Sequence, residues 1–463
     1  MAPGAMTLRP YQQAGADFLS TGAPARLLGD EPGLGKTRQA IHACDTLGAR
    51  RVLVLAPAVA KSHWQREFET LQALKRRVQV LSSQRDIIDP GMPLVVILNY
   101  DMIHSPEQPL RRKLMKQPWD VLVLDEIHTL KTPSAKRTRY VYGRHLDGEG
   151  GLVSCCWHVL GLSGTIMPNN ASELWPHLHA LAPSLIPDPL RPGQPLSYQR
   201  FIDSYAVTRD TPWGQKIVGS KNLPDLKRKL ASFMLRRRKV DVLRDLPPLT
   251  FELYALTLDA PPPTVDPQFD QLDDDALENV INQPGAISTI RRELGEAKVE
   301  PTVQLVLSEL NADPRGKIIV FAHHISVLDA LAEAFFGKIR TVRIDGRTSA
   351  AERDRAIEAF QGNPQARIFL GQIQAAGVAI TLTASSNVLI CEPSFVPSQN
   401  LQAASRAHRF GQRDAVLVRY LFVPNSLDER IIKILHRKTK DIAIVTNDDT
   451  INLGMPTRTS LDA

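Results

Sequence analysis

The sequence of 463 residues has few cysteines and no long apolar run. Its four cysteines form neither a Cys-x-x-Cys pair nor the spacing of a zinc site, so we expect reduced thiols and no structural metal. The longest apolar runs, 52–60 and 94–98, are too short to cross a bilayer, which predicts no membrane partner. The first residues lack the basic and apolar regions of a secretory signal. We therefore expect a cytoplasmic protein, or a nuclear one in a eukaryote.

Basic residues outnumber acidic ones, 56 to 49, which gives a formal net charge of +7. The excess gathers in short clusters at 75–77, 111–113, 227–229 and 236–239. Such clusters could line the phosphates of a polyanion or could be solvated helix faces, and composition alone favours neither. A nucleic acid is therefore a candidate partner.

Two series of short apolar segments alternate with amphipathic ones along the chain. The first series comprises residues 52–56, 94–98, 121–124 and 159–162. The second comprises residues 318–321, 342–344, 367–370, 388–391 and 416–422. This alternation is typical of parallel sheets covered by helices. We predict an α/β protein of two similar lobes, each a mainly parallel sheet flanked by helices, with a helical insertion between them.

Four segments follow from these patterns. Prolines and acidic residues interrupt the alternation between the two series, as a linker or a protruding insertion would. The segment from about residue 185 also lacks the alternation and looks mainly helical toward its end, so we assign it to the first lobe as an appendage. The predicted segments are a first lobe over 1–245, a linker or insertion over 246–300, a second lobe over 301–446 and a loose tail over 447–463.

The octapeptide Asp-Glu-Pro-Gly-Leu-Gly-Lys-Thr at 30–37 follows an apolar segment and precedes a helix-like one. That is the layout of a phosphate-binding loop. Gly33 and Gly35 would let the backbone curl so that N–H groups face an anion, Lys36 could reach the β and γ phosphates, and the Thr37 hydroxyl could ligate Mg²⁺. The strict pattern begins with glycine, where this loop has aspartate. Taken alone, the loop could still be an ordinary turn.

Two carboxylates, Asp125 and Glu126, end the apolar segment 119–124. Carboxylates at the end of a buried strand are costly unless they meet cations or solvent. Beside a phosphate loop, Asp125 would hold Mg²⁺ through water, and Glu126 would orient and deprotonate an attacking water. The alternative is a solvated acidic turn, which the presence of the loop earlier in the chain makes the weaker interpretation.

Residues 399–409 suit a helix that stops at Gly411. On such a helix Gln402, Arg406 and Arg409 fall at positions i, i+4 and i+7, on one face. Guanidinium groups in a second lobe could neutralise the charge that grows on a transferred phosphoryl group. On spacing alone, an exposed basic helix face is the commoner explanation.

With these motifs in this order, the sequence resembles the SWI/SNF-type DNA-dependent ATPases of helicase superfamily two over nearly all of residues 8–435. Aspartate in the first position is that family's own form of the loop. The resemblance implies two RecA-like lobes that use ATP and Mg²⁺. It further implies that Gln12 contacts adenine, that Gln402 lies at the nucleotide, and that Arg406 and Arg409 are arginine fingers.

Further segments match motifs of the same family. Residues 56–64 resemble the motif that tracks the DNA backbone, residues 163–165 the motif that couples hydrolysis to DNA contact, and residues 235–243 the signature between the lobes. The resemblance implies nucleic-acid contacts at Trp64, Lys131, Ser163 and Thr165.

Residues 321–324, residues 345–348 and Glu392 look most like the annealing-helicase, fork-remodelling branch of this family. The resemblance implies a monomeric ATPase that is stimulated by double-stranded or forked DNA and moves along it, recruited by an unidentified partner. Two alternatives share the same residues: a helicase that separates DNA or RNA strands, and a DNA-binding scaffold that hydrolyses no ATP. So compact a motor suits a bacterium or its virus better than a nucleus.

Overall fold

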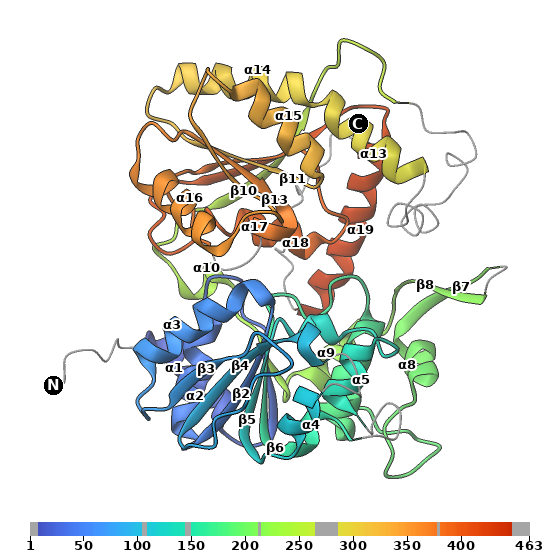
Figure 1. Ribbon diagram of the computed structural model, residues 1–463. Coiled ribbons are helices and arrows are strands. Elements are labelled where there is room, and N and C mark those ends of the chain that lie inside the picture. The colour runs from blue at the N-terminus through green and yellow to red at the C-terminus, as the bar shows by residue number, and fades with distance from the viewer. Residues whose placement is uncertain are drawn as a thin grey trace. The chain divides into compact units, whose positions relative to one another are not determined.

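The computed structural model describes residues 8–103, 109–143, 150–211, 214–263, 286–376 and 380–446. The chain divides into two compact units, the first up to Arg244 and the second from Asp245 to Ala443. Each unit is built on one parallel sheet flanked by helices, as the sequence predicts (Figure 1). The predicted loose tail and residues 264–285 of the predicted insertion lie outside the described residues.

The first sheet contains seven parallel strands in the order β3-β4-β2-β5-β6-β1-β9. The strands are β1 (Ala25–Leu28), β2 (Arg51–Ala56), β3 (Arg77–Val80), β4 (Leu94–Asn99), β5 (Trp119–Asp125), β6 (Cys156–Leu162) and β9 (Met234–Leu235). Strands β2, β4 and β5 are buried along most of their length, which explains their continuous apolar sequences. All four strands predicted for this lobe are confirmed.

The helices of the first unit carry apolar residues at helical spacing. They are α1 (Pro10–Ser20), α2 (Lys36–Thr46), α3 (Lys61–Leu71), α4 (Pro109–Met115), α5 (Lys136–Tyr142), α7 (Trp175–Leu181), α8 (Tyr198–Tyr205), α9 (Leu223–Leu230) and α10 (Lys239–Val242). In α9, for example, Leu223, Leu226 and Leu230 are buried at positions i, i+3 and i+7. Short 3₁₀ turns include η3 (Ile127–Leu130) and η5 (Ala171–Leu174).

The appendage predicted to be mainly helical from about residue 185 also contains a β-hairpin. Strands β7 (Ala206–Thr211) and β8 (Gly214–Ser220) pair antiparallel, with a register shift between Val207 and Thr208. The shift interrupts the period-two pattern by which a strand is recognised in a sequence. After α9 the chain returns to β9, which pairs with β1 at the edge of the main sheet.

The second sheet contains six parallel strands in the order β10-β15-β14-β11-β13-β12. The strands are β10 (Leu249–Ala255), β11 (Ile318–Ala322), β12 (Thr341–Ile344), β13 (Ile368–Gln372), β14 (Asn387–Ile390) and β15 (Val416–Phe422). The five strands predicted for this lobe are confirmed. Strand β10, an edge strand with one buried side chain, Phe251, falls in the segment expected to be a linker or insertion.

The helices of the second unit flank this sheet. They are α13 (Ala286–Ala297), α14 (Val299–Ala312), α15 (Ile325–Phe335), α16 (Ala350–Gly362), α17 (Ile373–Ala376), α18 (Pro397–Ala404) and α19 (Leu427–Thr446). Within the described parts of the chain, no helix is both long enough and apolar enough to cross a membrane.

Helix α18 ends at Ala404, so the prediction of one helix over 399–409 is wrong. Beyond it, two backbone N–H groups bond to carbonyls three residues back, and the carbonyl of Arg406 accepts a hydrogen bond of 2.9 Å from the backbone of another segment. These bonds replace the ladder that a longer helix needs. Arg406 and Arg409 therefore lie on turns, and not on one helical face with Gln402.

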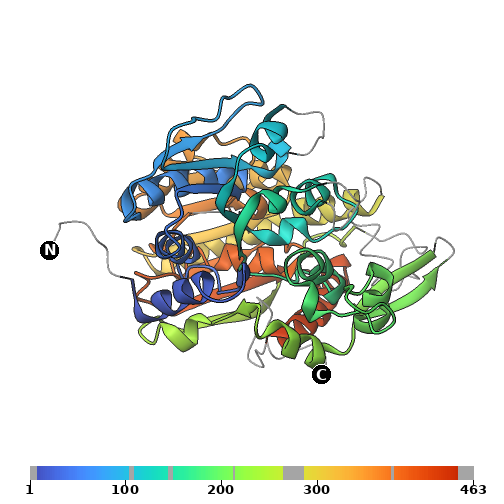
Figure 2. The same cartoon turned by 90° about the horizontal axis from the view of Figure 1, so that it is seen from below.

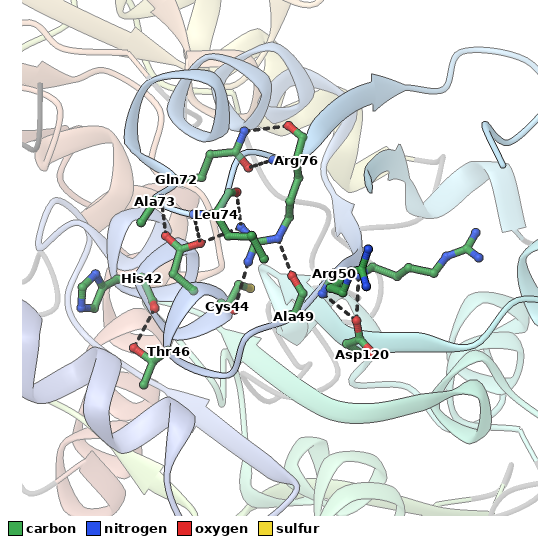
Figure 3. Close-up of polar contacts among 12 residues, drawn as sticks. His42, Cys44, Thr46, Ala49, Arg50, Gln72, Ala73, Leu74, Arg76 and Asp120 are labelled. Carbon is green, nitrogen blue, oxygen red and sulfur yellow. Dashed lines mark hydrogen bonds and ion pairs between the residues drawn. The ribbon is translucent and has the colours of Figure 1, made fainter. Parts of the chain in front are cut away.

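One basic cluster of the sequence is partly a structural element of the first unit (Figure 3). The side chain of Arg76 is buried and pairs with Asp45 Oδ1 at 2.7 Å. Its Nε donates to the carbonyl of Ala49 at 2.6 Å and its Nη2 to that of Cys44 at 3.1 Å. These groups lie at the carboxyl end of α2 and just beyond it, so Arg76 ties the end of the helix to the residues that follow it.

We expect Arg76→Ala to destabilise the first unit by about 3–5 kcal/mol, because it leaves the Asp45 carboxylate without its cation in a buried place. Urea unfolding followed by tryptophan fluorescence measures this, since all five tryptophans precede Arg244. Arg77→Ala is the matched control. Its ion pair with Asp89 is exposed, so we expect a loss below about 1 kcal/mol. Equal losses in the two variants would contradict the structural role of Arg76.

Candidate nucleotide-binding site

The predicted site residues of the first unit gather at the carboxyl edge of its sheet. Strands β5, β6 and β1 are neighbours, and they end at Asp125, at Leu162 before Ser163, and at Leu28 before the loop 29–35. In parallel sheets ligands bind at this edge, because loops and helix N-termini meet there. The sheet order thus brings together segments that lie more than a hundred residues apart.

The loop over 29–35 has the backbone of an anion-binding turn. Gly33 and Gly35 have φ angles of +97° and +77°, a region that L side chains rarely adopt. A Cβ on Gly35 would also lie 2.5 Å from Gln12 Nε2. Gly35 caps α2, so that Lys36 and Thr37 are its first two residues. The positive end of the helix therefore faces the loop.

Lys36 reaches over the loop toward the acidic residues. Its Nζ donates to the backbone carbonyl of Asp30 at 2.7 Å. Burial lowers the pKa of Lys36, and the negative charges of Glu126, Asp30 and Asp125 oppose that shift. The predicted loop lysine and the predicted carboxylates consequently share one electrostatic environment.

Two aromatic residues hold Asp125 in place. The indole Nε1 of Trp64, from α3, donates to Asp125 Oδ2 at 2.8 Å, and the Tyr100 hydroxyl donates to the Asp125 carbonyl at 2.7 Å. Burial and the adjacent charge of Glu126 raise the pKa of Asp125 to about 6, and the Trp64 hydrogen bond opposes the rise. A carboxyl group whose pKa is raised toward 7 and whose orientation is fixed by a hydrogen bond is typical of a functional site.

Glu126 has left-handed backbone geometry, with φ of +48°, which is uncommon for a residue with a side chain. Its Oε2 lies 3.2 Å from His128 Nδ1 and accepts a hydrogen bond from Ser163 Oγ at 3.4 Å. His128 Nδ1 and Ser163 Oγ lie 2.9 Å from each other. Glu126, His128 and Ser163 thus form one polar network between the ends of β5 and β6.

The residues expected to contact nucleic acid are largely buried. Trp64 and Ser163 have no exposed surface, and Thr165 has 3%. Lys131 is partly exposed and pairs with Glu173 of η5 at 2.5 Å. Trp64 donates to Asp125 and Ser163 donates to Glu126. Contact of these four residues with nucleic acid stays a prediction.

A buried ion pair stands at the first position of the loop, and sequence reasoning missed it. Asp30 is fully buried and pairs with Arg237 Nη2 at 2.5 Å, while Arg237 Nε donates to its other oxygen at 3.0 Å. Arg236 adds bonds of 3.0 and 3.1 Å to the carbonyls of Gly29 and Gly164. The segment after β9 therefore fastens both the phosphate loop and the loop after β6. Its signal in the sequence was a run of three arginines inside the family signature at 235–243.

Gln12 contacts the same loop from α1. Its Nε2 donates to the carbonyl of Leu34 at 3.3 Å, and its Oε1 accepts from the backbone N–H of Arg9 at 3.1 Å. The side chain is 8% exposed. Gln12 thus lies at the loop, and contact with adenine stays a prediction.

In the second unit, Gln402, Arg406 and Arg409 lie on α18 and the turns that follow it. Arg406 is buried, and Arg409 Nη1 donates to Thr381 Oγ1 at 3.2 Å. Burial lowers the pKa of Arg409 to about 10. A guanidinium in such a place is stabilised by an anionic ligand.

Two models of protein families match the chain. One is described as an SNF2-related domain and matches residues 11–262, which is more than half of the chain. The other is described as a helicase conserved C-terminal domain and matches residues 297–411. The first match covers the first sheet and extends over β10 of the second sheet, and the second match covers β11, β12, β13 and β14.

Several curated proteins are similar over nearly the whole chain. The SWI/SNF-related matrix-associated actin-dependent regulator of chromatin subfamily A-like protein 1 homolog of Caenorhabditis elegans is 29% identical over 93% of this chain and 61% of its own length. The SWI/SNF-related matrix-associated actin-dependent regulator of chromatin subfamily A-like protein 1 of Bos taurus is 30% identical over 94% of this chain and 44% of its own length. The DNA annealing helicase and endonuclease ZRANB3 of Homo sapiens is 28% identical over 94% of this chain and 40% of its own length. The chain thus spans 40 to 61% of the length of these relatives.

Two solved structures are also similar, both of the SWI2/SNF2 ATPase core of Sulfolobus solfataricus. The core in complex with dsDNA is 21% identical, with a TM-score of 0.44 and coverage of 97% of this chain and 95% of that chain. The core domain alone is 21% identical, with a TM-score of 0.45 and coverage of 94% and 89%.

A double-mutant cycle tests the pair of Asp30 and Arg237. We expect Arg237→Ala to cost about 3–5 kcal/mol in the unfolding of the first unit, because it strands a buried carboxylate. Adding Asp30→Ala should recover about 2 kcal/mol of that loss, since no charge is then left unpaired. Arg238→Ala is the control, because its pair with Asp241 is more exposed. Additive losses in the cycle would show that the two side chains are not coupled.

Proposed function

Because this chain belongs to the SNF2-related family, we propose that it moves along double-stranded DNA with the energy of ATP hydrolysis. It is the core of an SNF2-family DNA-dependent ATPase. One observation carries the proposal: Lys36, Asp125 and Glu126 lie together at the carboxyl edge of one sheet. A hydrogen bond from Trp64 orients Asp125, and one from Ser163 orients Glu126. That set can bind a nucleotide and activate water.

We assign phosphate binding to the loop and to the start of α2. The backbone N–H groups after Gly33 and Gly35 would face the phosphates, and Lys36 would exchange its bond to a loop carbonyl for bonds to phosphate oxygens. Gln12 at this loop would contact the adenine. Each of these residues belongs to α1, the loop or α2, so nucleotide binding would use preformed backbone geometry.

The oxygen donors of the site fit Mg²⁺. The Thr37 hydroxyl and the Asp125 carboxylate are hard ligands, and two such protein ligands suffice where phosphates and waters complete the shell. No group of three or more His, Cys, Asp or Glu that could hold a metal occurs among the residues that the structure describes. When bound, the ion would neutralise charge on the phosphates. Trp64 would keep Asp125 aimed at it.

We assign the general base to Glu126. Its carboxylate would orient a water and accept a proton from it as the water attacks the γ-phosphorus. His128 and Ser163 contact Glu126 and would hold it in that orientation. Because Ser163 also bonds to the Thr165 backbone, a change at Glu126 would be transmitted to the loop after β6. We propose this loop as the link between hydrolysis and DNA contact, with Lys131 at its rim.

The second unit would supply cations to the reaction. We propose that Arg406 and Arg409 stabilise the charge on the transferred phosphoryl group and that Gln402 lies at the nucleotide. Support comes from the burial of Arg406 and from the lowered pKa of Arg409, which an anionic partner would offset.

We propose forked DNA and strand annealing as the finer activity, because a relative that is 28% identical is named a DNA annealing helicase. A helicase that separates DNA or RNA strands would use the same ATPase residues. A scaffold without hydrolysis would use none of them. The monomeric state and the recruiting partner stay predictions.

Steady-state phosphate release with no nucleic acid, single-stranded DNA, duplex DNA, forked DNA or RNA tests the proposed function. We expect stimulation by duplex or forked DNA that weakens as salt rises, because phosphate contacts release counterions. Stimulation by single strands or RNA alone would point to a strand-separating helicase. Absence of hydrolysis with every nucleic acid would favour the scaffold.

In the same assay we expect Glu126→Gln to lower kcat by about 10²–10⁴-fold while ATP still binds, because the variant removes the base but leaves the loop intact. Binding of a fluorescent ATP analogue measures the second part. Glu69→Gln, an exposed glutamate on α3, is the control and should turn over normally. Normal turnover by Glu126→Gln would remove Glu126 from the mechanism.

We expect Trp64→Phe to shift the acid limb of the pH profile of kcat/KM upward by about 1–2 units. The variant removes a hydrogen bond to a carboxylate, worth about 1.5–3 kcal/mol, so the pKa of Asp125 rises above its present value of about 6. Fewer molecules then carry the ionised form at a given acid pH. Trp175→Phe is the control, because its Nε1 donates to a backbone carbonyl at 2.8 Å instead. An unmoved acid limb in Trp64→Phe would contradict this role.

A further inference from the structure

Helices α1 and α2 of the first unit lie side by side (Figures 1 and 2), and the amide of Gln39 is buried where they meet. Gln39 follows Lys36 by three residues on α2 and has no exposed surface. A glutamine is seldom buried so completely, and its amide then needs hydrogen-bond partners. Gln39 takes no part in the proposed hydrolysis, and its contacts show what it holds in place.

The side-chain amide of Gln39 is bonded at both ends. Its Nε2 donates to Asp30 Oδ2 and to the backbone carbonyl of Leu34, each at 3.1 Å. Its Oε1 accepts from Arg237 Nη2 at 2.7 Å. Because the carboxylate only accepts and the guanidinium only donates, this amide has a single orientation. Gln39 therefore connects the buried ion pair at the start of the phosphate loop with the residue just before Gly35.

The carbonyl of Leu34 is shared by two glutamines. Gln12 Nε2 donates to it from α1 at 3.3 Å, and Gln39 Nε2 donates to it from α2 at 3.1 Å. A carbonyl oxygen has two lone pairs, so these two bonds fill it. At its other end the Gln12 amide accepts from the backbone N–H of Arg9. Leu34 and Arg9 together therefore fix the orientation of the Gln12 amide.

Gly15 on α1 leaves the space that the Gln39 amide occupies. A Cβ at this position would lie 1.8 Å from Gln39 Oε1 and 2.5 Å from Arg237 Nη2. Gly15 follows Gln12 by three residues, so both lie on the side of α1 that meets α2. A glycine inside a helix lowers the stability of that helix, and the close approach of the Gln39 amide explains its presence here.

We propose that Gln39 is a positioning residue for adenine selectivity. It holds the Leu34 carbonyl, and this carbonyl orients the amide of Gln12. Adenine presents an acceptor and a donor on one edge, whereas guanine presents two acceptors there, so an amide of fixed orientation matches adenine alone. The inference rests on the proposed function, since it takes Gln12 as the adenine contact. It deepens that function by naming a second residue that selects the base.

Displacement of a fluorescent ADP analogue from the full chain by ADP or by GDP tests the inference. The two competitors carry the same phosphates, so the ratio of their Kd values isolates recognition of the base. Methionine has a length and volume similar to those of glutamine but no amide. We expect Gln39→Met to lower the preference for ADP by about 2–10-fold, the worth of one hydrogen bond.

Three further variants define the role of Gln39. Gln12→Ala should lower the preference for ADP at least as much, and the double variant no more than Gln12→Ala alone, because Gln39 acts through Gln12. Gly15→Ala should lower the preference too, since the added methyl group displaces the Gln39 amide. Gln13→Met is the matched control and should keep the preference, because Gln13 bonds instead to Asp17 on the same helix.

Equal weakening of ADP and GDP in Gln39→Met would show that Gln39 only maintains the loop, and it would overturn the inference. Additive losses of preference in the double variant, or no preference for ADP in the unsubstituted protein, would do the same. Only folded protein binds the analogue, so the ratio does not depend on the folded fraction. Failure of the proposed function is seen separately, as absence of DNA-stimulated hydrolysis in an unsubstituted protein that still prefers ADP.

Discussion

The buried ion pair of Asp30 and Arg237 holds together the loops at the carboxyl edge of the first sheet, on which the site of the first unit depends. It ties the phosphate loop after β1 to the segment after β9, and the neighbouring Arg236 extends the tie to the loop after β6. A glycine at position 30 would give no such anchor. Because a charge without its partner in a buried place is costly, both residues must be present together. The geometry of the loop thus rests on a residue two hundred positions away.

The carboxyl edge of the first sheet carries groups that do not favour the folded state. Asp125 and Glu126 are adjacent carboxylates, and Glu126 has left-handed backbone geometry. The pKa of Asp125 is raised from 3.8 to about 6. The pKa of Asp125 is higher in the folded than in the unfolded chain, so the free energy of unfolding falls as pH rises from about 4 to about 6. Above about pH 6 the whole of this stability is lost. Such a cost is expected where charge has to meet a nucleotide and a metal.

The structure also places several predicted residues where the sequence did not indicate. Trp64, expected at DNA, is buried and aims Asp125. One arginine of the 75–77 cluster is buried at the end of α2, whereas its neighbour is exposed. Both arginines of the second unit lie beyond the end of α18. Residue type and spacing do not report which side chains become buried or where a helix ends, because both depend on segments distant in sequence.

The sequence by itself determined the two parallel α/β sheets, nine of their strands, the phosphate loop and the acidic pair, because continuous apolar runs and glycine-rich turns encode these features locally. Tertiary structure alone decided that β9 and β10 join the sheets, since short or exposed edge strands carry little apolar signal. It also decided that 206–220 forms a hairpin, which a register shift concealed, and that Asp30 finds Arg237. Pairing between distant segments depends on the sheet order, which no local pattern contains.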